Sequence, residues 1–93
     1  MLEKRRVTMS KTGNELAPEE LIGRNVRRHR HRHGWSQEQL AEESGLHRTY
    51  VGSVERGERN VAVRNIFALA EALQIDPREL LTPSEEWDDI DDA

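Results

Sequence analysis

Three glycines in the middle of the chain limit what it can fold into more than any other feature. Gly34, Gly45 and Gly57 each follow a segment of mixed apolar and polar residues. Glycine is favoured just after the last turn of a helix, because it adopts the left-handed backbone conformation without a steric penalty. The spacing therefore predicts two short helices, at 36–44 and 48–56, joined by a tight turn.

The segments on either side of these helices also have helical patterns. Pro18 is a favoured first residue of a helix and is followed by two glutamates, so we expect a first helix that ends before Gly34. Apolar residues recur at helical spacing in a fourth segment: Ile66, Leu69, Ala70 and Leu73. Asp76 and Pro77 begin a fifth helix that continues to about Pro83. We predict an all-α fold of five helices.

The distribution of charge divides the chain into three parts. Residues 1–17 have a net charge of +2 and no apolar periodicity, so we interpret them as a flexible N-terminal arm. Residues 18–82 form the predicted folded domain and contain ten positive and ten negative side chains. Residues 83–93 carry a net charge of −6 and are predicted to be a disordered acidic tail. Within 24–59, eight arginines outnumber five glutamates, which makes this stretch locally basic.

Composition argues against several classes of function. The chain has no cysteine, hence no disulfide framework, and no apolar stretch long enough to cross a membrane, so we expect a cytoplasmic protein. It lacks a nucleophile motif or phosphate-binding loop, so we predict no enzyme activity, catalytic residue or cofactor. His29 and His33 have a spacing that zinc can use, but no third ligand accompanies them, and we predict no metal site.

One face of the helix at 48–56 has the residue types that recognise DNA bases. Val51 and Val54 are expected to point toward the core, which leaves the opposite face toward solvent. An arginine can form two hydrogen bonds with guanine in the major groove of double-stranded DNA, and hydroxyl groups or a small residue allow further contacts. We predict base contacts by four residues of this face: Arg48, Thr49, Gly52 and Ser53.

The two ends of this helix pair suit contacts with the DNA backbone. The start of the helix at 36–44 offers free amides and a positive dipole end to a phosphate, and polar or basic residues follow the helix at 48–56. Tyr50 has two interpretations, because its ring can contact DNA or pack on the domain beside Val51. We predict backbone contacts by six residues: Ser36, Gln37, Tyr50, Arg56, Arg59 and Asn60.

The run from Gly34 to Gly57 resembles the helix-turn-helix of the phage lambda repressor and Cro family, also called Xre-type, with the motif at the second and third helices. The resemblance covers residues 20–82. More narrowly, the chain is similar to the controller proteins of restriction-modification systems in three runs: Arg48-Thr49-Tyr50, Glu55-Arg56 and Arg59-Asn60. It departs from them in the order Gly52-Ser53, where controllers have Ser-Gly.

The resemblance implies a bacterial transcriptional regulator that binds a near-palindromic operator as a homodimer. It also implies a structural ion pair between Arg30 and Glu55, which keeps Arg30 out of the predicted DNA contacts. Several apolar residues exceed what a small core requires, and we assign them to a two-fold dimer interface: Phe67, Ile75, Leu80 and Leu81.

Two alternatives remain open at this stage. The domain is also compatible with an antitoxin-like module whose main role is to bind a partner protein, with DNA binding as a secondary activity. The acidic tail has three interpretations: it confers solubility only, it mimics nucleic acid and shields the basic surface of the domain, or it binds a partner protein through Trp87 and Ile90.

Overall fold

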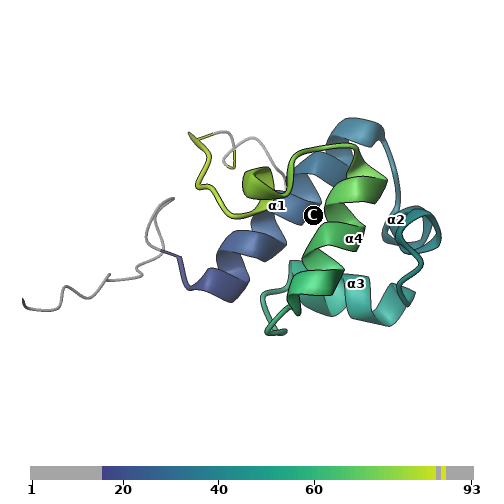
Figure 1. Cartoon of the computed structure of the whole chain (residues 1–93), viewed down its shortest axis with the longest axis horizontal. Coiled ribbons are helices and arrows are strands. Elements are labelled where there is room, and N and C mark those ends of the chain that lie inside the picture. Colours follow the sequence, from purple (N-terminus) through teal and green to yellow (C-terminus); the bar gives the residue numbers. More distant parts are fainter. Residues whose placement is uncertain (1–15, 86, 88–93) are drawn as a thin grey trace, which may run out of the picture.

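The computed structural model describes residues 16–85 and residue 87. Along these residues it contains α-helices and a short 3-10 helix and no strand, which confirms the predicted all-α class (Figure 1). In chain order the elements are α1 (Pro18–His33), α2 (Gln37–Ser44), α3 (Arg48–Glu55), α4 (Val63–Leu73) and the 3-10 helix η2 (Pro77–Leu80). None of these helices has the length and apolar character that crossing a bilayer needs.

Local capping explains why α2 is short. Ser36 precedes α2, and its hydroxyl oxygen accepts a hydrogen bond of 3.0 Å from the amide of Gln39. The side chain of Gln39 in turn accepts a bond of 2.7 Å from the amide of Ser36. At the other end, Gly45 adopts a φ of 78° and its amide donates to the carbonyl of Ala41. The two hydrogen bonds form a capping box, and the predicted glycine stop is confirmed.

The fifth predicted helix is only a 3-10 turn of four residues, so the prediction of five α-helices is wrong in its last member. The side chain of Asn25, on α1, donates to the carbonyl oxygens of Leu80 and Thr82 at 2.9 and 3.0 Å. In a longer helix these carbonyls would bond to amides further along the chain. Here they are bonded to α1, and the chain leaves the helical path after Leu80.

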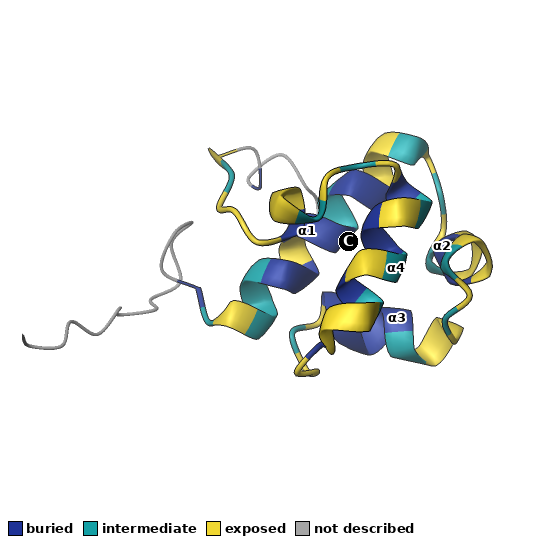
Figure 2. Ribbon diagram, in the orientation of Figure 1, coloured by how far each residue is buried: buried dark blue, intermediate teal, exposed yellow. Residues whose placement is uncertain are grey.

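The hydrophobic core lies where the four α-helices meet, as the dark blue inner faces in Figure 2 show. All four helices and η2 contribute side chains that are less than 2% exposed: Val26, Leu40, Val51, Val54, Leu69, Leu73 and Leu80. The periodic apolar stripe of α4 packs inward as predicted. Because the core requires every helix, the positions of α2 and α3 are fixed by packing on α1 and α4.

The four residues assigned to a dimer interface differ in how far the single chain buries them. Leu80 is fully buried in the core of the single chain, so its assignment to a dimer interface is wrong. Ile75 is half-buried and packs against the core. Phe67 and Leu81 are 57% and 48% exposed, and Val63, which the sequence analysis did not select, is 69% exposed. Among the described residues, the large apolar side chains left exposed are therefore those of Val63, Phe67 and Leu81.

The close approach of α1 and α3 depends on Gly23. A β-carbon at this position would lie 2.4 Å from the carbonyl oxygen of Val54 and 2.8 Å from that of Glu55. Both atoms belong to the backbone of α3, which cannot move aside as a flexible side chain can. Gly23 thus allows α3 to lie directly on α1.

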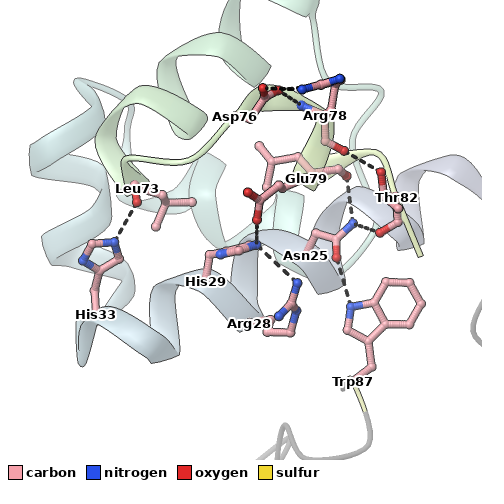
Figure 3. A network of polar contacts seen from close by, with 11 residues as sticks. Asn25, Arg28, His29, His33, Leu73, Asp76, Arg78, Glu79, Thr82 and Trp87 are labelled. Atoms are coloured by element: carbon pink, nitrogen blue, oxygen red, sulfur yellow. Dashed lines mark hydrogen bonds and ion pairs between the residues drawn. The ribbon is translucent and has the colours of Figure 1, made fainter. Parts of the chain in front are cut away.

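The folded domain extends further at both ends than the charge pattern predicted. Leu16 is buried, so the predicted arm ends before this residue. Trp87 is only 4% exposed, and its indole N–H donates to the side-chain oxygen of Asn25 at 3.1 Å (Figure 3). The prediction of a disordered tail from 83, with Trp87 free for a partner protein, is therefore wrong at Trp87. Residues 1–15 and Ile90 lie outside the described residues.

Candidate DNA-binding surface

A shallow hollow of about 590 Å³ lies between the start of α2 and the exposed side of α3. Six residues that the sequence analysis selected for DNA contacts line it together: Ser36, Gln37, Arg48, Thr49, Gly52 and Arg56. The short turn between α2 and α3 brings these residues, which are up to 20 positions apart, to one surface. The two helices pack together as the second and third helices of a helix-turn-helix do.

Arg48 and Thr49 are the exposed residues of the first turn of α3. Within the described part of the chain, neither side chain has a hydrogen-bond or ion-pair partner, so the guanidinium and hydroxyl groups keep their full capacity for a ligand. Their position at the start of α3 also places them near the positive end of the helix dipole. This is the part of α3 that can present side chains to the edges of bases.

Gly52 is buried, although it lies on the face predicted to contact DNA. The side chains of Gln37 and Arg56 lie over it, with atoms 3.2 and 3.3 Å from where a β-carbon would be. Gly52 therefore makes room for these two side chains in the free protein. A DNA backbone reaches it only if Gln37 and Arg56 swing away.

Ser53 does not lie on the open face, and its predicted role in base contact is wrong. It is 5% exposed, and its hydroxyl donates to the carbonyl of Tyr50 at 2.8 Å and accepts from the guanidinium of Arg59 at 3.0 Å. Ser53 comes five residues after Arg48, so at about 100° per residue the two side chains point about 140° apart around the helix axis. Arg59, in the loop after α3, covers the side of the helix where Ser53 lies.

Buried Glu55 holds α1, α2 and α3 together from beneath the hollow. Its carboxylate accepts two hydrogen bonds from Arg30, of 2.7 and 2.9 Å, and a third of 2.9 Å from the side-chain amide of Gln37. A further N–H of Arg30 donates to the carbonyl of Trp35 at 2.8 Å. The predicted partners Arg30 and Glu55 are thus in contact. Gln37, predicted to bind a phosphate, has its amide nitrogen bonded to Glu55 in the free protein.

Arg56 follows α3 at the edge of the hollow and is exposed. It forms an ion pair of 3.0 Å with Glu58. This hydrogen bond raises the pKa of Arg56 and lowers the pKa of Glu58, so both groups stay charged at neutral pH. Because the pair is on the surface, it contributes little to stability.

Tyr50 lies at the other edge of α3 and is half-buried. The guanidinium carbon of Arg59 lies 5.5 Å from the centre of its ring, and the side-chain amide of Asn65 donates to its hydroxyl at 3.0 Å. The ring also packs against the core, as the second interpretation from the sequence expected. Asn65, near the start of α4, was missed by the sequence analysis, although a polar residue in the first turn of an apolar helix is a signal. Asn60, in the loop between, is exposed.

The histidines of α1 have separate partners rather than a common ligand (Figure 3). Buried His29 lies 3.5 Å from the carboxylate of Glu79, while His33 is 2.8 Å from the carbonyl oxygen of Leu73 and stacks on Trp35. Burial and the charge of Arg28 lower the pKa of His29, so its ring is neutral in the folded protein near pH 7. The described residues contain no cluster of three or more potential metal ligands.

The helix pair, its hollow and the exposed arginine at the start of α3 define a helix-turn-helix DNA-binding protein. The family model for the helix-turn-helix, HTH_3, matches residues 26–80, and the chain belongs to this family. It is a DNA-binding transcriptional regulator of the lambda repressor and Cro type, as the sequence resemblance implied.

The chain is similar to several proteins of this type. It is 56% identical over 63 residues to the control protein C.SmaI of Serratia marcescens, a match that covers 68% of this chain and 75% of the relative. The crystal structure of the restriction-modification controller protein C.AhdI from Aeromonas hydrophila matches with a TM-score of 0.65 and 55% identity, over 67% of this chain and 94% of that one. The hypothetical transcription factor NHTF from Neisseria matches with a TM-score of 0.74 and 39% identity, over 87% and 94%.

Proposed function

We propose that this regulator is a restriction-modification controller that binds a near-palindromic operator as a homodimer. The observation that carries the proposal is the hollow between α2 and α3, where Arg48 and Thr49 are exposed and without a partner among the described residues. The similarity to C.SmaI and C.AhdI supports the controller role in particular.

In this proposal α3 enters the major groove, and Arg48 and Thr49 contact base edges. Arg48 donates two hydrogen bonds to a guanine, which is worth roughly 1 to 3 kcal/mol of discrimination against other bases. Thr49 offers a hydroxyl and a methyl group. Gly52 comes close to the DNA once Gln37 and Arg56 turn from their positions above it toward the phosphates.

Contacts with the backbone come from both sides of the hollow. Ser36 and Gln37 lie at the start of α2, where the positive end of the helix dipole attracts a phosphate. On the other side, the DNA meets polar and basic side chains that follow or flank α3: Tyr50, Arg56, Arg59 and Asn60. These contacts set affinity and register rather than sequence preference.

The dimer is formed through the exposed apolar residues of α4 and the segment after η2. Phe67 and Leu81 supply the central contacts, and Val63, one helical turn before Phe67, extends the surface. Burial of such side chains is the main favourable term in association. A two-fold axis through this surface places the two copies of α3 on half-sites about 10 bp apart.

Selection of bound sequences from a random duplex pool tests the proposal. Wild type, Arg48→Ala and Arg78→Ala are compared at one salt concentration; Arg78 is also exposed but lies on η2, outside the hollow. We expect a two-fold symmetric motif from wild type and Arg78→Ala. Arg48→Ala is expected to lose preference at one base pair in each half-site while keeping salt-sensitive binding. If wild type selects no motif, the proposal is wrong and a protein partner becomes the better hypothesis.

A further inference from the structure

We infer that Asn65 is a positioning residue for DNA binding: it fixes the hydroxyl of Tyr50 as a hydrogen-bond donor toward a backbone phosphate. The inference rests on the proposed function, because it needs Tyr50 at the DNA backbone. It adds a residue of α4, outside the helix-turn-helix, to the DNA-binding machinery.

The direction of one hydrogen bond carries the argument. The side-chain amide nitrogen of Asn65 lies 3.0 Å from the hydroxyl oxygen of Tyr50. An amide N–H can only donate, so the hydroxyl oxygen accepts this bond. A phenol has a single proton, and the bond from Asn65 leaves that proton available for another acceptor. A phosphate oxygen, which accepts only, is the matching partner.

The rest of the cluster keeps the ring of Tyr50 in place. The guanidinium of Arg59 lies over the ring at 5.5 Å and is held by a hydrogen bond of 3.0 Å to the hydroxyl of Ser53. That hydroxyl donates to the carbonyl of Tyr50 at 2.8 Å, which connects the cluster to the backbone of α3. Tyr50 thus has contacts on its face and at its hydroxyl before DNA arrives. Little side-chain entropy remains to be lost on binding.

The surroundings favour an anion at this place. Three exposed polar or basic residues are close in sequence to Tyr50 or Asn65: Arg59, Asn60 and Arg64. The guanidinium of Arg59 places its positive charge over the ring of Tyr50. Asn65 is in the first turn of α4, where the helix dipole is positive. A phosphate that accepts the hydroxyl proton of Tyr50 would also be attracted by these charges.

Reversal of the hydrogen bond gives a direct test. Asn65→Asp nearly preserves the shape of the side chain, but a carboxylate can only accept a hydrogen bond. It therefore takes the phenol proton of Tyr50 and leaves only lone pairs of the hydroxyl to face the phosphate. We measure DNA affinity of wild type, Asn65→Asp, Tyr50→Phe and the double variant by fluorescence anisotropy at fixed salt. Gln74→Glu, an exposed amide-to-acid change at the other end of α4, controls for the added negative charge. Thermal unfolding of each variant checks that the fold is kept.

The expected result is a strong dependence on Tyr50. Asn65→Asp should weaken binding roughly tenfold to a hundredfold in wild type, the range for a hydrogen bond to a charged group, and much less in the Tyr50→Phe background. A duplex with a neutral methylphosphonate at the contacted phosphate should bind wild type and Tyr50→Phe equally. Equal losses from Asn65→Asp in both backgrounds, or a loss no larger than that of Gln74→Glu, would overturn the inference. If these occur while Arg48→Ala still relaxes base preference, the proposed function survives and only the role of Asn65 fails.

Discussion

The guanidinium of Arg30 binds the carboxylate of Glu55 through two hydrogen bonds, of 2.7 and 2.9 Å, in the interior between α1 and α3. The side chain of Glu55 has no exposed surface, and Gln37 donates a third hydrogen bond to it. A buried charge is costly unless it is paired, so this contact selects one arrangement of the three helices. The surface proposed to meet DNA is built directly above it.

Removal of Glu55 should therefore destabilise the fold. Glu55→Ala leaves the buried Arg30 charge without its partner, and we expect the free energy of unfolding to fall by about 3 to 5 kcal/mol. Urea denaturation followed by circular dichroism measures this. Glu58→Ala is the matched control, because Glu58 pairs with Arg56 on the surface, and it should leave stability unchanged. Similar losses in the two variants would contradict the role given to Glu55.

Substitution by alanine should have opposite effects on stability at Gly23, which packs against backbone, and at Gly52, which packs against flexible side chains. At Gly23 a β-carbon meets backbone oxygens of α3 at 2.4 and 2.8 Å, so Gly23→Ala should cost about 1 to 3 kcal/mol of stability. At Gly52 it meets only the flexible ends of Gln37 and Arg56. Gly52→Ala should keep or raise stability, because alanine favours a helix by about 1 kcal/mol, and should weaken DNA binding. Thermal unfolding and anisotropy on both variants check this; a stable Gly23→Ala would refute the close-packing argument.

The local part of the fold was predictable because its causes are local. The capping box of Ser36 with Gln39 and the turn at Gly45 need only neighbouring residues, and α2 has the predicted ends. The same holds for the apolar stripe of α4, whose periodicity is contained in one segment. These features require no knowledge of what the helix packs against.

The errors lie where a distant residue decides the outcome. Ser53 is covered by Arg59 from the loop after α3, and Leu80 packs into the core formed by all four helices, where Asn25, 55 positions away, binds its carbonyl. Trp87 appeared to belong to the acidic tail because its neighbours are acidic, yet it contacts α1. Periodicity assigns a residue to one face of its own helix, but it does not say which loop or terminus covers that face.

Neighbouring leucines should have separate effects on folding and on dimerisation. Leu80 is fully buried, so Leu80→Ala should reduce stability by about 2 to 5 kcal/mol. Leu81 is 48% exposed, so Leu81→Ala should leave the monomer stable and shift the monomer–dimer equilibrium toward monomer. Sedimentation equilibrium and urea unfolding, each at two protein concentrations, distinguish the two effects. A Leu81→Ala protein that dimerises like wild type would remove Leu81 from the proposed interface.

His29 should make stability depend on pH. Burial and Arg28 lower its pKa below the ordinary value of 6.5, so below that pH the unfolded chain takes up a proton more readily than the folded one. The contribution of neutral His29 to stability is therefore complete above pH 6.5 and declines as the pH falls toward the lower pKa of the folded state. His29→Gln should flatten this part of the profile in urea unfolding between about pH 5 and 7.5. His31→Gln, at an exposed position of the same helix, should keep the wild-type slope.

Asn25 should couple the C-terminal segment to α1. Asn25→Ala removes the partners of the Leu80 and Thr82 carbonyls and of the Trp87 indole, and each buried polar group left unpaired costs about 1 to 3 kcal/mol. Trp87→Phe loses only the indole bond, so it should cost less. Both single variants remove the hydrogen bond between the indole and Asn25, so the double variant loses it only once. The double variant should therefore lose less free energy of unfolding than the two single variants lose together. Urea unfolding of the four proteins measures this coupling; simple additivity would mean that Asn25 and Trp87 stabilise the fold independently.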